Sequence, residues 1–231
     1  MALFEQNPFL QSKSTEENSN VFIDFLQTVV IALSICVVIY LFIATPNEVH
    51  GQSMEPNFHD GELLLTNKIV QLLGTTGLSN IVGDYKRGDV VIFKHTLSQE
   101  DFIKRVVAVG GDTIMVKDGF VYVNNTKLNE SYLPSGRRTE AGNFLEEGVS
   151  QRVPEGSYAV FGDNRGNSTD SRSNLVRFVK RSDFKGRVFF RYWPLSEFGI
   201  ISRQEYVGFE ARVLWYKQFK QNFTTPKSWI S

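Results

Sequence analysis

One long apolar segment stands out from an otherwise mixed chain of 231 residues. Residues 25–44, FLQTVVIALSICVVIYLFIA, carry no charge. At about 1.5 Å per residue, a helix of this length spans about 30 Å, the thickness of the hydrocarbon core of a bilayer. The pattern predicts a transmembrane anchor over residues 21–44, preceded by a polar N-terminal tail over residues 1–20.

The segment before this run does not have the pattern of a cleaved signal peptide. A signal peptide begins with a basic region and has a shorter apolar core. Here the leader is long and acidic, with Lys13 as its one base. We therefore expect a permanent anchor. Lysine and arginine near the ends of a membrane helix set its orientation, and they are too scarce here to do so, because the next base is Lys68.

After the anchor, short apolar runs between turn signals predict strands and a mainly β domain over residues 45–205. The expected strands are Glu62–Leu65, Val90–Phe93, Phe102–Val109, Thr113–Lys117, Phe120–Val123 and Ser157–Phe161. Asp118-Gly119 predicts a tight hairpin between two of them. Residues 127–153, rich in glycine and proline, predict a loop-rich insertion. Residues 206–231 form an aromatic and basic tail, which fits either the membrane interface or a terminal strand with a loose end.

Composition removes several classes of function. Twenty-five basic residues balance twenty-five acidic ones, so no net field favours nucleic acid, and none is expected as a partner. The one cysteine, Cys36, lies within the apolar run and excludes an intramolecular disulfide. Three histidines and one thiol do not form a standard zinc cluster. The sequence indicates no metal and no cofactor.

Four polar or mixed segments are candidates for chemistry: Gly51–Phe58, Arg87–Phe93, Asp101–Asp112 and Gly162–Arg172. Taken one at a time, each also fits an ordinary structural role. Gly51–Phe58 fits a turn, Arg87–Phe93 a turn that leads into a buried strand, and Gly162–Arg172 a solvated loop. Their occurrence in this order after one membrane anchor is more specific than any of them alone.

Lys104 and Arg105 interrupt a strand of large apolar residues. Side chains alternate between the faces of a strand, and both faces are otherwise apolar, so we expect one of these bases near a buried surface. Burial disfavours the ammonium form and lowers a lysine pKa from about 10.4. A lysine brought to about 8 is neutral in about a tenth of molecules at pH 7, enough to act as a general base. A lysine that reaches out to solvent from a strand edge is the alternative.

From the anchor to about Trp193-Pro194, these segments resemble the bacterial type I signal peptidases, membrane-anchored serine proteases with a Ser/Lys dyad. The resemblance implies an antiparallel, barrel-like β catalytic fold with Ser53 as nucleophile and Lys104 as general base. It implies that Ser168 holds the lysine amine, that Asp170 and Arg172 form a supporting ion pair, and that Gly162 and Asp163 orient the site. The oxyanion or substrate pocket would involve Gly51, Gln52 and Met54.

The chain departs from the pattern of that family at several positions. Asn57 follows Pro56 where threonine often stands, and Phe58 comes next. Gly166 replaces a residue that is often Asp or Asn, and Gly51 stands where some members have a serine hydroxyl for the oxyanion. The change at Gly51 leaves backbone N–H groups near Ser53 as the expected donors.

The resemblance implies an endopeptidase that removes signal peptides from secretory preproteins during or after export. The lipid bilayer and the export machinery are the further candidate partners. The expected location is the plasma membrane, single-pass, with a cytoplasmic N-terminus and an extracytoplasmic catalytic domain. The alternatives are a membrane-tethered, non-enzymatic β module and a self-cleaving Ser/Lys protease of the repressor type. The endoplasmic-reticulum branch of the family has histidine at the position of Lys104, so the lysine argues against membership in that branch.

Overall fold

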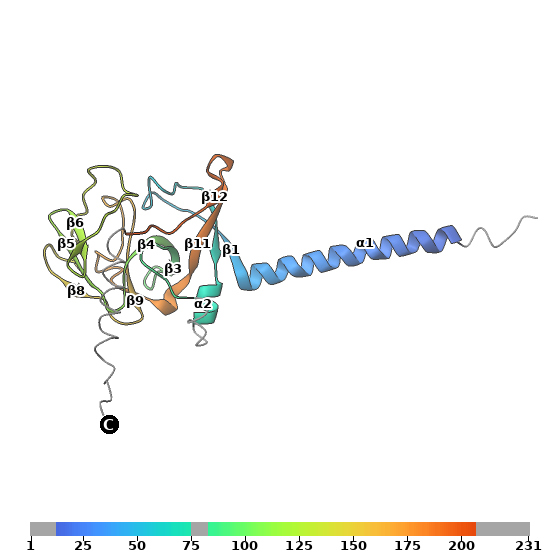
Figure 1. The fold of residues 1–231 in the computed structure, drawn as a ribbon, viewed down its shortest axis with the longest axis horizontal. Coiled ribbons are helices and arrows are strands. Elements are labelled where there is room, and N and C mark those ends of the chain that lie inside the picture. Colours follow the sequence, from blue (N-terminus) through green and yellow to red (C-terminus); the bar gives the residue numbers. More distant parts are fainter. Residues whose placement is uncertain (1–12, 75–82, 207–231) are drawn as a thin grey trace, which may run out of the picture. The chain divides into compact units, whose positions relative to one another are not determined.

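The computed structural model describes residues 13–74 and 83–206, and it divides the chain into two compact units, Met1–Ala44 and Thr45–Ser231. The first unit contains the helix α1 (Lys13–Val38), followed by a π-helical turn, η2 (Ile39–Ile43) (Figure 1). The helix thus begins eight residues before the anchor expected from the sequence. Its Val21–Val38 segment is long and apolar enough to cross a membrane, and none of it is buried in protein.

The larger sheet of the second unit carries most of the predicted strands, and its described strands follow the order β1-β2-β11-β3-β4-β9-β10, with β12 beside β11. Pairing along β2, β11, β3, β4, β9 and β10 is antiparallel. The strand bounds are β1 (Ala44–Glu48), β2 (Leu63–Asn67), β3 (Val90–Lys94), β4 (Asp101–Val109), β9 (Ser157–Phe161), β10 (Val179–Lys180), β11 (Phe184–Trp193) and β12 (Gly199–Ile200).

A smaller antiparallel sheet contains the predicted hairpin. Its order is β7-β6-β5-β8, with the bounds β5 (Thr113–Lys117), β6 (Phe120–Val123), β7 (Thr126–Lys127) and β8 (Gln151–Arg152). Asp118 and Gly119 join β5 to β6 with φ angles of 53° and 80°, as a tight two-residue hairpin turn requires. The prediction of this hairpin is confirmed. Three short helices complete the described fold: α2 (Ile69–Gly74), η3 (Arg181–Asp183) and η4 (Leu195–Glu197).

The strand β4 is covered on both faces, which explains its continuous apolar sequence. Val107 belongs to a core cluster shared with β5, β6 and β9, whereas Val106 packs with residues of β3 and β9 on the other side. Lys104 and Arg105 are consequently both buried, at 4% and 5% exposed. One buried base was expected from the sequence, and both lysine and arginine are buried in the structure.

A third core cluster lies under the segment between β1 and β2. It combines Met54 and Phe58 of that segment with Leu64, Ile92 and Ile103 of the larger sheet. Because these side chains are almost fully buried, the segment that contains Ser53 is anchored on the sheet.

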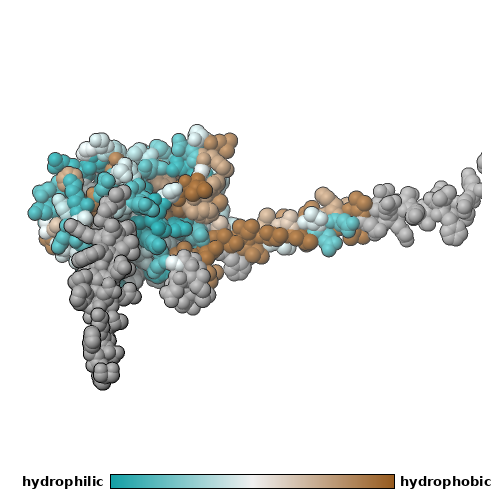
Figure 2. Space-filling view, viewed as in Figure 1, coloured by the Kyte–Doolittle hydropathy of each residue, from teal (hydrophilic) through white to brown (hydrophobic). Residues whose placement is uncertain are grey.

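Apolar side chains also reach the surface over β11 and β12, where Figure 2 shows a concentration of hydrophobic residues. Trp193, Leu195, Phe198 and Ile200 are each more than half exposed. The aromatic and basic tail expected over residues 206–231 lies outside the described residues except for Tyr206, which is buried.

Candidate active site

Ser53 lies in a turn-rich segment that is fixed from both sides. On the side of the core, the neighbouring Met54 is fully buried. From the loop after β9, Asn164 donates its backbone N–H to the Ser53 carbonyl at 3.0 Å and its side-chain amide to the Gln52 carbonyl at 3.0 Å. Gly51, with φ of 80°, begins the turn and donates its N–H to Asp60. The serine therefore stands on a constrained loop, as a nucleophile requires.

Lys104 extends from β4 to the serine. Its Nζ lies 2.7 Å from Ser53 Oγ and 2.9 Å from the carbonyl oxygen of Ile103. The two residues are 51 positions apart in the sequence, so this contact depends on the fold and not on local structure. A short distance from a buried amine to a serine hydroxyl is the geometry that a general base needs.

Burial lowers the pKa of Lys104 from its ordinary value to about 8, although the nearby Asp170 and Asp163 carboxylates act in the opposite direction. An amine with this pKa is neutral in about a tenth of molecules at pH 7 and in most of them at pH 9. It can therefore accept a proton under ordinary conditions.

Both of these carboxylates are bound by arginines. Arg105, the neighbour of the lysine on β4, donates to the two Asp163 oxygens at 2.9 and 2.6 Å. Arg172 donates to the two Asp170 oxygens at 2.8 Å each, and this is the ion pair expected from the sequence. Each carboxylate that favours the protonated lysine therefore has its own guanidinium counter-charge within the buried site.

Gly162 lies where no side chain fits. A Cβ atom at this position would overlap Ser168 Oγ and would lie 2.5 Å from the Ser53 carbonyl oxygen. The Gly162 N–H donates to Asp170 at 3.0 Å. The glycine therefore lets the loop after β9 pass directly against the nucleophile turn.

Ser168 is close to the dyad, but its hydroxyl is not paired with the lysine. Ser168 Oγ is buried and has no hydrogen-bond partner among the residues that the structure describes. The contact that the resemblance implies, from Ser168 to the Lys104 amine, is thus not among the contacts of Lys104, whose Nζ is hydrogen-bonded to Ser53 and Ile103.

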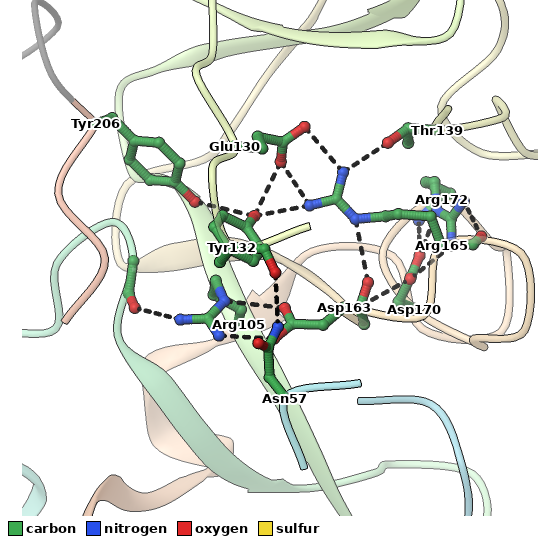
Figure 3. A network of polar contacts seen from close by, with 12 residues as sticks. Asn57, Arg105, Glu130, Tyr132, Thr139, Asp163, Arg165, Asp170, Arg172 and Tyr206 are labelled. Atoms are coloured by element: carbon green, nitrogen blue, oxygen red, sulfur yellow. Dashed lines mark hydrogen bonds and ion pairs between the residues drawn. The ribbon is translucent and has the colours of Figure 1, made fainter. Parts of the chain in front are cut away.

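A polar network joins the loop after β9 to the insertion (Figure 3). Arg165 donates to Glu130, to Thr139 Oγ1 at 2.6 Å and to Tyr132 Oη at 2.7 Å. Its Nε also donates to the Gly162 carbonyl at 3.1 Å. Because Arg165 is 2% exposed, this network is a buried support for the loop that contacts Ser53.

Ser53 and Lys104 line an open cleft of about 990 Å³. Ile92, Phe102 and Ile103 give it apolar surface, while Gln52, Asn167 and Thr169 add polar groups. Gln52 was expected in the pocket and lines it. Among the described residues, Met54 and Gly51 are not part of the cleft wall: Met54 is fully buried in the core, and Gly51 has no side chain to present. No group of three or more His, Cys, Asp or Glu in the described part of the chain could hold a metal ion.

Several supporting residues were not identified from the sequence. Arg105 was visible as a base in an apolar strand, but its pairing with Asp163 depends on a separation of 58 residues. Asn164 and Arg165 belong to the polar Gly162–Arg172 segment. The sequence marked this segment as a candidate part of the site but did not predict which partners these two residues contact. Nothing in the pattern around Glu130 or Tyr132 marked them, because Arg165, which binds both, is 35 and 33 positions away in the sequence.

The described part of the chain has a mainly β fold in which a buried lysine lies beside a serine, an arrangement compatible with the serine hydrolases that use lysine as their base. Residues 22–193 match the family described as "Signal peptidase, peptidase S26". The chain is 34% identical to signal peptidase I of Bacillus licheniformis, covering 81% of this chain and 96% of that one. It is 39% identical to signal peptidase I of Bacillus caldolyticus, covering 72% and 90%. It is 32% identical to signal peptidase IB of Staphylococcus aureus, covering 76% and 92%.

A crystal structure of signal peptidase I from Enterococcus faecalis V583 is 27% identical and covers 45% of this chain and 96% of that one. The TM-score of this match is 0.38.

The sequence matches establish the family: the chain belongs to the signal peptidases of family S26 and is a signal peptide-removing endopeptidase. The family, the enzyme class and the mainly β fold with one N-terminal apolar helix, all expected from the sequence, are confirmed.

Proposed function

We propose that Ser53 and Lys104 are the catalytic pair, and that they cleave secretory preproteins at the extracytoplasmic surface of the plasma membrane. The observation that carries the proposal is the 2.7 Å separation between Ser53 Oγ and the buried Lys104 amine. A lysine with a pKa of about 8 provides the base, so that no histidine is needed.

The first half of the reaction forms an acyl-enzyme. Neutral Lys104 takes the proton of Ser53 while Oγ bonds to the scissile carbonyl carbon. The protonated lysine then passes this proton to the leaving amine as the C–N bond breaks. Backbone N–H groups at Ser53 are the proposed donors to the oxyanion, because Gly51 provides no hydroxyl.

The second half releases the cleaved signal peptide. Lys104, neutral again, takes a proton from water as the water oxygen attacks the ester carbon. The Ser53–carbonyl bond breaks and the proton returns to Ser53. Ser168, whose buried hydroxyl lies against Gly162, and the Asp170–Arg172 pair are the proposed supports that keep the amine aligned.

The length of chain between anchor and nucleophile supports a membrane-held substrate. Ser53 lies nine positions after Ala44, and a chain of this length reaches at most about 30 Å when fully extended. A signal peptide has its apolar core in the membrane and a cleavage site of small residues just beyond it. The preprotein and the enzyme would then meet at the same surface.

Paired alanine variants test the dyad. Ser53→Ala and Lys104→Ala should each reduce preprotein processing in detergent or liposomes by at least about 1,000-fold, since each removes a group that takes part in bond-making. Ser150→Ala and Lys117→Ala, at exposed positions, are matched controls. Normal processing by either dyad variant would refute the assignment. Labelling of Ser53 by an acylating inhibitor, lost in Lys104→Ala, would separate an enzyme from a binding module.

The side of the membrane is tested separately. In sealed vesicles of known orientation, the catalytic unit should be digested by protease only when the extracytoplasmic face is accessible. Digestion from the cytoplasmic face would refute the proposed topology while leaving the chemistry of the dyad intact.

A further inference from the structure

Asn57 connects the nucleophile turn to three other parts of the fold. It lies four residues after Ser53 and is half-buried. Its backbone carbonyl accepts a hydrogen bond from Arg191 of β11 at 2.8 Å. Its side chain points toward Asp163 of the loop after β9 (Figure 3).

Both hydrogens of the Asn57 amide are in use. Nδ2 donates to Asp163 Oδ2 at 2.9 Å and to the backbone carbonyl of Tyr132 at 3.0 Å. These partners are 106 and 75 positions away in the sequence. An amide nitrogen has two donors, whereas a hydroxyl has one and a carboxylate has none. Asparagine therefore meets a requirement that threonine and aspartate do not.

Asp163 links this amide to the strand of the catalytic lysine. Its Oδ2 accepts hydrogen bonds from Asn57 Nδ2 and from Arg105 Nη2, and its Oδ1 accepts one from Arg105 Nε. Arg105 directly follows Lys104 on β4, and Asp163 is 1% exposed. The serine turn and the lysine strand are thus fastened to one buried carboxylate.

We propose that Asn57 is a positioning residue for the Ser53–Lys104 pair, which fixes the nucleophile turn against β4 through Asp163. The inference rests on the proposed function, because it assigns Asn57 a role in the geometry of that dyad. Asn57 lies outside the cleft wall and is not a catalytic residue.

The charges around Lys104 make the proposal testable by pH as well as by rate. Asp163 and Asp170 face the amine from the loop after β9, each paired with an arginine. The remaining charged or titratable groups of the cleft are Glu48, His50, Lys94, Glu100, Asp101 and Lys185. A new carboxylate at position 57 would add negative charge beside Asp163 and favour the protonated lysine.

Two substitutions separate the expected effects. Asn57→Thr retains one donor, so it should reduce kcat on a preprotein about 3- to 10-fold, with KM unchanged within about twofold. Asn57→Asp retains the shape but replaces both donors with a charge, and it should reduce kcat about 100-fold. It should also move the acid limb of the pH–rate profile upward by about half a unit or more. Asn129→Thr, at an exposed position of the insertion, is the control and should match wild type.

The outcomes distinguish this inference from the function on which it rests. Full activity and an unchanged pH profile in both Asn57 variants, with Ser53→Ala inactive, would overturn the role of Asn57 alone. Activity in Ser53→Ala would overturn the dyad itself. A lower melting temperature with a normal kcat and pH profile would show a purely structural residue and would also overturn the proposal. If Asn57→Asp does not fold, kcat and KM of Asn57→Thr decide the question.

Discussion

At the scale of single residues, the central feature is an amine that the fold keeps poorly hydrated. Lys104 is 4% exposed, and the two carboxylates near it are each bound by an arginine in a two-pronged contact. These carboxylates favour the ammonium form, and burial outweighs them in setting the pKa of Lys104. Each arginine supplies the counter-charge of one buried carboxylate.

The pH dependence of cleavage follows from this arrangement. Since the pKa of Lys104 is lowered to about 8 and only the neutral amine accepts a proton, kcat/KM should rise about tenfold between pH 7 and pH 9. Below pH 7 it should fall about tenfold per unit. Initial rates on a short peptide substrate, measured from pH 5.5 to pH 9.5 at constant ionic strength, check this. A profile that stays flat down to pH 5.5 would point to another base.

The same buried amine should reduce the stability of the protein. The pKa of Lys104 in the folded chain lies below its ordinary value of 10.5, so the unfolded chain binds more protons between pH 8 and pH 10.5. Stability is therefore lost as the pH falls through this window, by up to about 3 kcal/mol. Lys104→Met should be inactive, yet melt at a higher temperature than wild type at pH 7. Thermal unfolding at pH 7 and pH 10 measures this, and the difference between the two proteins should shrink at pH 10.

The two residues of the proposed dyad were predictable from the sequence for different reasons. Lys104 was recognisable because a base interrupts an apolar strand, and Ser53 because its segment resembles that of a known family. Asn57 gave no such signal: an asparagine beside a proline in a turn is ordinary, and its two partners come from distant segments. Contacts that are fixed by the tertiary fold leave no local pattern to read.

At the scale of elements, the close approach of the loop after β9 to the nucleophile turn depends on Gly162. A methyl group there would meet Ser168 Oγ and the Ser53 carbonyl, and the latter is backbone that cannot rotate away. Gly162→Ala should displace the serine turn and reduce kcat by about 100-fold or more, the usual cost of a displacement of about 1 Å.

Gly166, in the same loop, provides the matched control for that substitution. A Cβ atom at Gly166 meets only the end of Arg137, at 3.8 Å, so Gly166→Ala should retain activity within about threefold. Kinetics of both variants on the same peptide, together with their melting temperatures, make the test. Equal losses in the two would mean that the loop is sensitive to any added side chain, and not that Gly162 provides a close contact.

The elements themselves differed in how well the sequence predicted them. The predicted hairpin at Asp118-Gly119 agrees with the structure, because its turn residues and the alternation of apolar and polar residues in its strands are both local signals. The helix α1 begins at Lys13, before the anchor expected over residues 21–44: hydropathy marks the part of a helix suited to lipid, while polar residues from Lys13 onward extend the helix without changing that pattern. The apolar residues on both faces of β4 indicated burial from its own sequence, but the elements that cover each face could not be predicted, because they depend on the position of the smaller sheet.

At the scale of the whole molecule, the chain has no net charge to attract a substrate from a distance. Its two compact units are joined at Ala44, and the first contains a helix long and apolar enough to cross a membrane. Confining enzyme and substrate to one surface raises their effective concentration without any new contact. The anchor should therefore matter for preproteins in membranes and not for the chemistry of the site.

Removing the anchor tests whether the helix serves access to membrane-held substrates and the second unit serves the chemistry. A chain that lacks residues 1–44 should cleave a short peptide in detergent with kcat/KM within about threefold of the full chain, since the dyad and its supports lie in the second unit. On a preprotein embedded in liposomes it should be at least about 100-fold slower, because the confinement is lost. A full-length chain with an unrelated apolar helix in place of residues 21–43 is the control and should process the preprotein normally. Equal losses of activity on the peptide and on the preprotein would mean that the helix is required for the catalytic fold itself. A full rate on the embedded preprotein would mean that other surfaces of the enzyme bring it to its substrate.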